Sequence, residues 1–179
     1  MEFERNLWAR FGVAVRITGA EEYDILGKES SSLRDVLTNI IADGRCSLEG
    51  ESYIPDICVE DFDSEYGTNY SGEYTAETYF PIQTRDELGG DDGSAGAPAT
   101  ADGKRCLWVC VGATMHINSS EESAILRGDD AAVREAFARI FEERRYKLDG
   151  ETFIPDTSIA DFNRLYGTKY PDCEICANF

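Results

Sequence analysis

The chain has 179 residues, 42% of them hydrophobic, and its 35 Asp and Glu against 17 Lys and Arg give a formal net charge of −18. This composition is typical of a globular protein with a buried core and excludes an intrinsically disordered chain. The strongly negative electrostatic field of such a chain disfavours direct binding to nucleic acid or to an anionic membrane surface.

No segment of the sequence has the character of a targeting or membrane-spanning stretch. Residues 1–10 lack the apolar run of a signal peptide, and nowhere does the chain reach the roughly 18 apolar residues of a membrane helix. We therefore expect a cytoplasmic protein. Its six cysteines are expected to be reduced, because Cys46 and Cys58 align with Tyr146 and Ser158 in the repeat described next.

The sequence contains an internal repeat with an offset of 100 residues. Residues 7–70 align with 107–170 without a gap, and 23 of the 64 pairs are identical. This pattern predicts a tandem duplication of one small module. A module of this size buries about 60% of its unfolded surface, which favours packing of the two copies about a pseudo-twofold axis.

Each copy opens with alternating apolar residues, which predict a strand with one buried face. A capping box follows, formed by Thr18 with Glu21 and by Asn118 with Glu121, and predicts a short helix or helical turn. The alternating residues are Phe11, Val13, Val15 and Ile17 in the first copy and Val111, Ala113, Met115 and Ile117 in the second.

The main helix of each copy is predicted from apolar residues at i, i+3, i+4 and i+7 spacing, after start signals at 30–32 and 129–130. The first of these helices should end near Gly44 in the left-handed conformation, whereas Arg144 predicts a different ending in the second copy. The apolar residues are Leu33, Val36, Leu37, Ile40 and Ile41, and Val133, Ala136, Phe137, Ile140 and Phe141.

A tight β-hairpin is predicted next, because Glu49-Gly50 and Asp149-Gly150 separate short strand-like runs. A proline closes each hairpin, and a last helix is expected over 57–66 and 157–166. The fold class is therefore α+β, a tandem duplication of a β-α-β-β-α module with an additional helical turn after the first strand. The predicted caps of the last helices are Asp56 and Asp156 at the N-termini and Gly67 and Gly167 at the C-termini.

The domain organisation follows from the repeat. The first module is expected over 1–88 and the second over 104–179, joined by a flexible linker at 89–103 that is rich in Gly, Ala and Asp. The segment 74–83 is too apolar for a linker and predicts an additional edge strand, and the tail 174–179 is a candidate for the same role in the second module.

Metal and histidine chemistry have weak support. The single histidine, His116, aligns with Arg16 and is expected on the polar face of a strand. Four cysteines in C-x3-C and C-x2-C spacing leave a zinc site open, although sulfurs four residues apart on a strand lie about 13 Å from each other. We therefore expect no metal and no cofactor. The four cysteines are Cys106, Cys110, Cys173 and Cys176.

The acidic motifs also have structural explanations that require neither metal binding nor catalysis. Asp61-x-Asp63-x-Glu65 partly matches a calcium loop, but Gly67 comes one place late and the second copy lacks the third ligand. The pairs at 21–22 and 121–122 are typical of a helix's first turn. We expect no enzyme. For an enzyme with an unfamiliar carboxylate site, the first candidates are Tyr66, Tyr166, Asp61, Asp161, Arg45 and Arg145.

The two copies differ most in charge. Residues 1–88 carry a net charge of −12, whereas 104–179 carry −3. The acidic surface of the first copy is the candidate partner-binding site. The second copy places basic residues along and after its main helix, for contact with the first copy or a partner. The acidic residues are Asp56, Glu60, Asp61, Asp63, Glu65, Glu73 and Glu77; the basic residues are Arg134, Arg139, Arg144, Arg145 and Lys147.

These observations lead to the hypothesis of a non-enzymatic inhibitor that binds a basic surface on another protein. Its carboxylates would take the place of nucleic-acid phosphates and block a nucleic-acid-binding enzyme, as phage or mobile-element inhibitors of CRISPR or restriction nucleases do. The alternative is an intracellular adaptor or immunity module without mimicry, whose acidity keeps it soluble. Whether the chain forms a homodimer is left open by the sequence.

Overall fold

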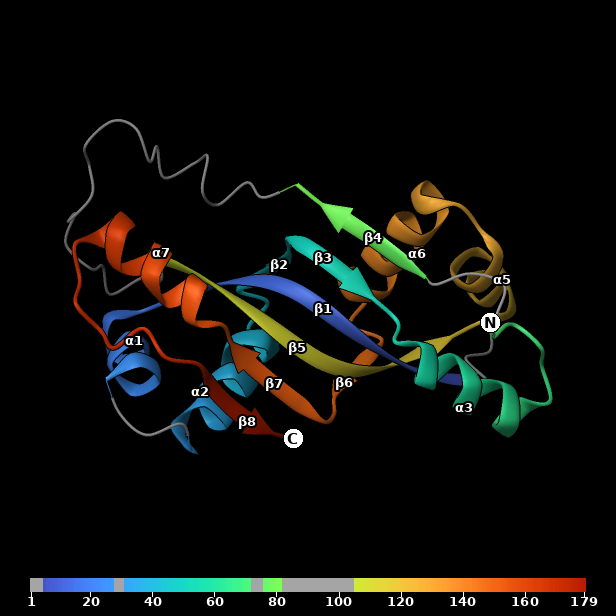
Figure 1. The fold of residues 1–179 in the computed structure, drawn as a ribbon, viewed down its shortest axis with the longest axis horizontal. Coiled ribbons are helices and arrows are strands. Elements are labelled where there is room, and N and C mark those ends of the chain that lie inside the picture. Colours follow the sequence, from blue (N-terminus) through green and yellow to red (C-terminus); the bar gives the residue numbers. More distant parts are fainter. Residues whose placement is uncertain (1–4, 28–30, 72–75, 82–104) are drawn as a thin grey trace. The chain divides into compact units, whose positions relative to one another are not determined.

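A computed structural model describes residues 5–27, 31–71, 76–81 and 105–179 and shows an α+β fold (Figure 1). The described strands form an antiparallel sheet in the order β4-β3-β1-β5-β7-β8, with β2 paired to β1 and β6 paired to β5. The strands are β1 (Arg5–Ile17), β2 (Cys46–Leu48), β3 (Gly50–Tyr53), β4 (Glu77–Phe80), β5 (Arg105–Ile117), β6 (Tyr146–Leu148), β7 (Glu151–Ile154) and β8 (Ile175–Asn178). The helices are α1 (Gly19–Leu26), α2 (Ser31–Ala42), α3 (Asp56–Tyr66), α5 (Ser119–Arg127), α6 (Asp130–Glu142) and α7 (Asp156–Tyr166).

The predicted strands and main helices are confirmed. All eight alternating residues of the two opening strands are buried, now within β1 and β5. Leu37 and Ile40 on α2 and Phe137 and Ile140 on α6 are fully buried, as the helical spacing required. The predicted edge strands are observed as β4, which pairs with β3, and β8, which pairs with β7.

The short helices α1 and α5 begin at the predicted capping boxes. Thr18 accepts a hydrogen bond from the backbone N–H of Glu21, whose side chain accepts one from the backbone N–H of Thr18. Asn118 and Glu121 repeat this arrangement. Reciprocal capping satisfies two backbone donors that a helix N-terminus otherwise leaves without partners, which explains why these two sequences begin a helix here.

The ends of the main helices correct one prediction. Gly44 has a φ of 75°, as expected, but Arg144 has a φ of 58° and occupies the same left-handed position. The backbone N–H of Arg45 bonds to the carbonyl of Ile40, and that of Arg145 bonds to the carbonyl of Ile140. The two helices therefore end alike, because the tertiary contacts beyond the helix hold the backbone of Arg144 in a conformation that its side chain disfavours.

The predicted tight hairpin is wrong. Ser47 of β2 lies opposite Ala14, and Tyr53 of β3 lies opposite Arg10 on the same strand, β1. β2 and β3 are thus successive stretches of one strand that runs antiparallel to β1, and a bulge at residues 49–50 separates them. Gly50 has a φ of 82°. The glycine has the positive φ that a tight turn would require, but here it lies in a bulge and the chain does not reverse. The strands β6 and β7 repeat this arrangement along β5.

The last helices begin one residue earlier than predicted. Asp56 and Asp156 are their first residues, and the N-cap positions are Pro55 and Pro155, which make no side-chain capping bond. Proline ends the preceding strand and has a φ suited to the residue before a helix, so the predicted aspartate N-caps are wrong by one position. The predicted glycine C-caps are confirmed, with φ values of 68° and 67°.

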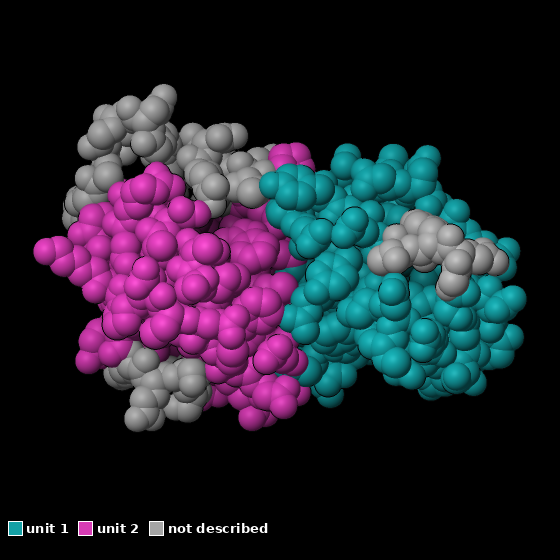
Figure 2. Space-filling model, viewed as in Figure 1, with its two compact units in different colours: residues 1–11, 50–80, 112–150 teal, residues 12–49, 81–111, 151–179 magenta. Residues whose placement is uncertain are grey.

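The chain divides into two compact units that cut across the two sequence repeats (Figure 2). The strands β1 and β5 have 13 residues each, longer than the usual strand of about 5–6 residues, and each contributes one half to either unit. The modules predicted at 1–88 and 104–179 are therefore not the compact units. Unit 1 consists of residues 1–11, 50–80 and 112–150, and unit 2 consists of residues 12–49, 81–111 and 151–179.

Each unit has its own helical layer. In unit 1, α6 contacts both α5 and β4, and the ring of Phe11 on β1 lies 5.3 Å from that of Phe137 on α6 in an edge-to-face arrangement. In unit 2, α2 contacts α1 and β8 in the same way. Three pairs of equivalent elements begin and end 100 residues apart: β1 and β5, β2 and β6, and α3 and α7.

Candidate functional site

The acidic segment, defined here as residues 50–80, contains eight carboxylates and neither Lys nor Arg. It forms β3, α3 and β4 of unit 1. The predicted residues on α3 other than Asp63 are exposed, and Glu77 is exposed on β4. Glu73 lies outside the described residues. The exposed carboxylates of α3 are Asp56, Glu60, Asp61 and Glu65.

Helix α3 and its counterpart α7 differ most in the charge of their exposed residues. No Lys or Arg in the described part of the chain forms an ion pair with Glu60, Asp61 or Glu65. On α7, by contrast, Asp161 pairs with Arg164 at 3.2 Å. The exposed Ile57, at 60% of its accessible surface, adds an apolar contact site beside these carboxylates. One backbone thus carries an unneutralised acidic surface in one copy and a balanced surface in the other.

Asp63 has a structural role. Its carboxylate accepts hydrogen bonds from the hydroxyl of Thr68, at 2.7 Å, and from the backbone N–H groups of Tyr70 and Ser71, at 2.9 and 2.8 Å. Burial on its own would raise the pKa of Asp63, but these bonds hold it well below its usual range. Asp63 therefore fixes the loop after α3 and is not available to a partner in the way the exposed carboxylates are.

The second copy replaces Asp63 with Asn163, and the loop explains the change. Asn163 accepts hydrogen bonds from Thr168 and from the backbone of Tyr170, and its amide donates to the Tyr170 carbonyl. The next residue is Pro171, which has no N–H to donate. An amide therefore satisfies this loop, whereas the loop after α3 needs a second acceptor.

A pair of like charges lies on the exposed strands of the acidic segment. The carboxyl of Glu77 on β4, with smaller contributions from burial and charge repulsion, raises the pKa of Glu51 on β3. The exposed Tyr79 lies opposite Glu51 in the strand register. A cationic side chain placed here would relieve the repulsion between the two carboxylates.

Two of the basic residues predicted to face the first copy or a partner form ion pairs within α6. Arg134 pairs with Asp130 at 2.8 Å and Arg139 with Glu135 at 3.1 Å, each one turn along α6. The division into units also changes the charge balance: unit 1 carries a net charge of −10 and unit 2 of −8. The contrast between the copies is therefore not a contrast between the units, and what remains distinctive is the acidic segment.

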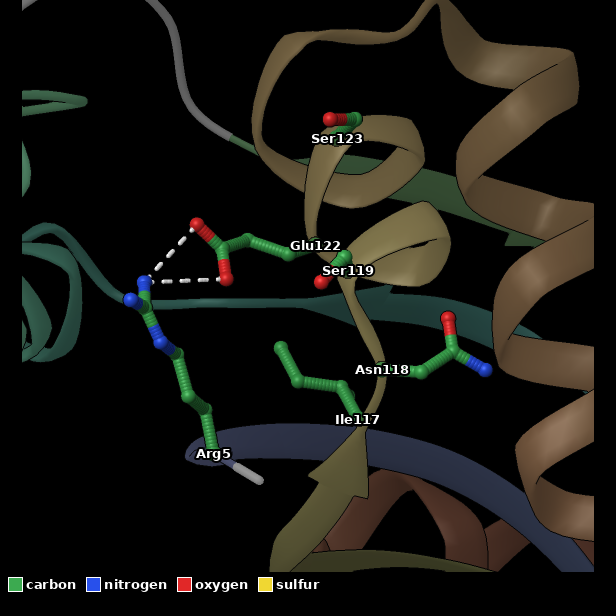
Figure 3. A pocket seen from close by; sticks show the side chains of 6 residues that line it. All are labelled: Arg5, Ile117, Asn118, Ser119, Glu122 and Ser123. Carbon is green, nitrogen blue, oxygen red and sulfur yellow. Dashed lines mark hydrogen bonds and ion pairs between the residues drawn. The ribbon is translucent and has the colours of Figure 1, made fainter. Parts of the chain in front are cut away.

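A buried ionic cluster in unit 1 was not predicted as a site. Nη1 of Arg5 lies 3.1 Å from both carboxylate oxygens of Glu122 (Figure 3). The hydroxyl of Tyr70 donates to the same carboxylate at 2.5 Å, and the guanidinium of Arg5 lies 5.0 Å from the ring centre of Tyr66. Burial, together with the bond to Glu122, raises the pKa of Tyr70.

Unit 2 contains the equivalent cluster. Nη1 of Arg105 lies 3.3 Å from Glu22, the hydroxyl of Tyr170 donates to Glu22, and the guanidinium lies 4.8 Å from the ring centre of Tyr166. Burial raises the pKa of Tyr166 and of Tyr170 to about 12. Both clusters consist of residues that are identical at an offset of 100, and this identity was the signal in the sequence. It was overlooked because Glu22 and Glu122 were explained as residues of a helix's first turn.

A polar cavity of about 220 Å³ lies beside the Arg5 cluster (Figure 3). Its charged residues, Arg5 and Glu122, neutralise each other, and Asn118 at its wall caps α5. The remaining wall residues are Ile117, Ser119 and Ser123. The cavity therefore has no net charge with which to select a charged ligand.

The remaining candidates for catalysis have structural partners. The hydroxyl groups of Tyr66 and Tyr166 accept hydrogen bonds from the backbone of Asn6 and Cys106, both at 3.0 Å. Each predicted arginine binds a capping-box glutamate: Arg45 to Glu21 at 2.7 and 2.8 Å, and Arg145 to Glu121 at 2.5 and 2.8 Å. His116 lies 2.6 Å from Asn6 through Nδ1.

The cysteines form no disulfide, and within the described ranges no three metal-ligating side chains come together. Burial, with repulsion from Asp61, raises the pKa of the Cys58 thiol to about 11. Burial and the bond to Glu174 raise that of Cys176. Both thiols are therefore protonated at neutral pH, which disfavours thiolate chemistry.

No family model, no curated protein and no solved structure matches this chain. None of the helices among the described residues is long and apolar enough to cross a membrane. The functional argument therefore depends on the residues of the chain itself.

Proposed function

We propose that the protein is a non-enzymatic inhibitor whose acidic segment binds a basic surface on another protein. One observation supports this function more than any other: the carboxylates of α3 other than Asp63 are exposed, and Glu60, Asp61 and Glu65 have no cationic partner among the described residues. Holding like charges together on one helix costs stability, so their persistence on only one of two matched helices favours a role in recognition.

The partner that fits best is a nucleic-acid-binding enzyme. Asp56 and Glu60, and Asp61 and Glu65, are each four residues apart, so the two carboxylates of each pair lie about 6 Å apart along α3. A row of carboxylates competes for the Lys and Arg side chains that otherwise neutralise phosphates, and the binding should weaken with salt as phosphate contacts do. CRISPR and restriction nucleases are enzymes with such surfaces.

An adaptor or immunity module without mimicry is the second candidate. The exposed Ile57 and Tyr79 favour it, because apolar side chains beside the carboxylates add affinity that salt does not weaken. The two candidates differ in their response to nucleic acid. A mimic loses its partner to added DNA or RNA, whereas an adaptor keeps it.

A matched pair of variants tests the proposed surface. Glu60→Lys with Asp61→Lys reverses the charge on α3, and Ala160→Lys with Asp161→Lys places lysines at the equivalent positions of α7. Asp63 is left unchanged because it holds the loop after α3. Tagged wild-type protein and both variants would be used to capture proteins from host lysate and from a panel of purified nucleases, at low and moderate salt, with and without competing DNA or RNA.

The proposal predicts that the wild type and the α7 variant capture a nucleic-acid-binding enzyme that competitor displaces, and that the α3 variant does not. Capture that resists both salt and competitor would support the adaptor. Equal capture by the two variants would exclude α3 as the binding surface.

We also infer that the chain arose by duplication of one module. The support is the gapless 100-residue offset, the identical pairs, and the 100-residue spacing of three pairs of elements, β1 and β5, β2 and β6, and α3 and α7. The pseudo-twofold packing, the flexible linker at 89–103 and the cytoplasmic location stay predictions.

A further inference from the structure

Each compact unit is assembled from both halves of the chain, taken here as residues 1–81 and 105–179. Unit 1 takes residues 112–150 from the second half, and unit 2 takes residues 12–49 from the first half. Neither half contains a complete unit. The contacts that complete a unit are therefore contacts between the halves.

In unit 1 these contacts form a polar and an apolar joint. Arg5 and Tyr70 of the first half both bind Glu122 of the second half, at 3.1 and 2.5 Å. Phe11 of the first half lies edge-to-face against Phe137 of the second half. The ionic part of this joint is partly shielded from water, since the Glu122 side chain is 11% exposed and that of Arg5 is 35% exposed.

The polar contacts of the unit 2 joint use the same residue types with the halves exchanged. Arg105 and Tyr170 of the second half bind Glu22 of the first half. The indole N–H of Trp108 donates to the Glu49 carbonyl at 2.7 Å, and in unit 1 that of Trp8 donates to the Asp149 carbonyl at the same distance. The residues of the polar joints that are identical between the halves are Arg5 and Arg105, Trp8 and Trp108, Glu22 and Glu122, Tyr66 and Tyr166, and Tyr70 and Tyr170.

Each half therefore carries both sides of the joint. An interface of this kind is self-complementary, and the same contacts form whether the two halves belong to one chain or to two chains. Within one chain the covalent connection sets an effective concentration for the two halves, which is of about millimolar order if the connection is the flexible linker predicted from the sequence. The closed monomer is favoured below that concentration, and exchange between chains becomes accessible near it.

We propose that a second copy of this chain is a partner for the joint: two chains exchange their second halves, so that every unit contains the first half of one chain and the second half of the other. The exchanged dimer has two of each unit and the same residue contacts as two monomers. It does not depend on the proposed binding function, because its joints lie outside the exposed carboxylates of α3.

Charge reversal across the Arg5–Glu122 pair tests the exchange in full-length chains. Arg5→Glu places two carboxylates together in unit 1, and Glu122→Arg places two guanidinium groups together, so each variant alone is strained in its monomer and in its homodimer. In a mixed exchanged dimer, one joint pairs the carboxylate introduced at position 5 of one chain with the guanidinium introduced at position 122 of the other, and the second joint is native. The two variants would be unfolded in urea, refolded together at about 1 mM, and analysed by size exclusion with light scattering.

The proposal predicts a dimer with a one-to-one ratio of the two variants by intact mass, at least about tenfold more abundant than in either variant refolded alone. The chain carrying both substitutions is the control and should refold as a monomer, because its joint is restored in cis. Mixed and separate refolding that give the same dimer fraction would overturn the proposal. If a single variant does not refold, tagged and untagged wild-type chains refolded together replace it. If tagged and untagged chains co-purify after joint refolding but not after mixing in the native state, the result supports exchange. If they do not co-purify after joint refolding at about 1 mM, the result overturns exchange.

Discussion

The two buried ionic clusters differ in exposure, and this difference predicts unequal costs for the same substitution. Arg105 and Glu22 have side-chain exposures of 9% and 8%, whereas Arg5 and Glu122 have 35% and 11%. Glu22→Ala leaves a buried guanidinium without its carboxylate, which costs about 3–5 kcal/mol. Glu122→Ala leaves Arg5 free to recover water, and its main cost is the buried hydroxyl of Tyr70, about 1–3 kcal/mol. We expect Glu22→Ala to be the more destabilising by about 2 kcal/mol.

Urea unfolding of both variants measures this difference. Far-UV circular dichroism reports the whole chain, and tryptophan fluorescence reports each unit, because Trp8 belongs to unit 1 and Trp108 to unit 2. Each 1 kcal/mol corresponds to about 2–4 °C in Tm for a chain of this length, so thermal melts provide a second reading. Equal losses in the two variants, or a larger loss for Glu122→Ala, would refute the argument from exposure.

Further predictions concern the loop, the pH dependence and the strained helix end. Asp63→Asn should cost about 1 kcal/mol in urea unfolding, since Ser71 N–H loses its acceptor, and adding Ser71→Pro should recover most of that loss; no recovery would contradict the assigned bond. Tyr166 and Tyr170 have pKa values raised to about 12, so their contribution to stability is present below pH ~10, the unfolded pKa, and is lost as pH rises toward 12. Tyrosinate absorbance should therefore show a late-titrating group of tyrosines in the folded protein, and uniform titration near pH ~10 would contradict the burial. The hydrogen bond from Arg45 lowers the pKa of Glu21; burial alone would raise the pKa of Glu121, but the bond from Arg145 outweighs it and the pKa is lowered. The contribution of both pairs to stability is therefore present above pH ~4.3 and falls as pH drops through the lowered values. A melting temperature unchanged between about pH 5 and 2 would argue against both pairs. Arg144→Gly should raise stability by up to about 1 kcal/mol and Gly44→Ala should lower it by a similar amount, and thermal melts in which Arg144→Gly is destabilising would mean that its side-chain contacts outweigh the backbone strain.

Local structure followed closely from the sequence, because each element depended on contacts within a few residues. The capping boxes at Thr18 and Asn118 and the glycine caps at Gly67 and Gly167 are short-range interactions, and they were observed as predicted. The prediction of a tight hairpin was wrong for a physical reason. A Gly with positive φ serves a tight turn and a bulge equally well, and only the position of β1 beside both stretches decides between them.

The assembly of the units could not be read from the sequence. The repeat predicts two modules, and a gapless alignment is equally compatible with each copy folding on itself or with the two copies sharing elements. The deciding contacts, such as Arg5 with Glu122, join residues 117 positions apart. Periodicity and capping carry no information at that separation.

The candidate site was predicted in part. The exposed carboxylates of α3 are where the sequence placed them, but Asp63 was misassigned because nothing in its own helix indicates that it bonds to residues 68–71. The comparison of Asn163 and Pro171 with Asp63 and Ser71 contained the clue, since the acceptor and the donor change together. Glu51 was missed, because only strand pairing brings it to Glu77.

The most direct test of the acidic segment as a recognition surface is a titration of isotope-labelled protein with a short peptide rich in Lys and Arg, followed by amide chemical shifts. The account predicts shift changes concentrated in α3 and β4, larger than those in α7 and β8, and an apparent affinity that falls as salt is added. Shift changes no larger in α3 than in α7 would contradict the claim that the exposed carboxylates of α3 form the binding surface.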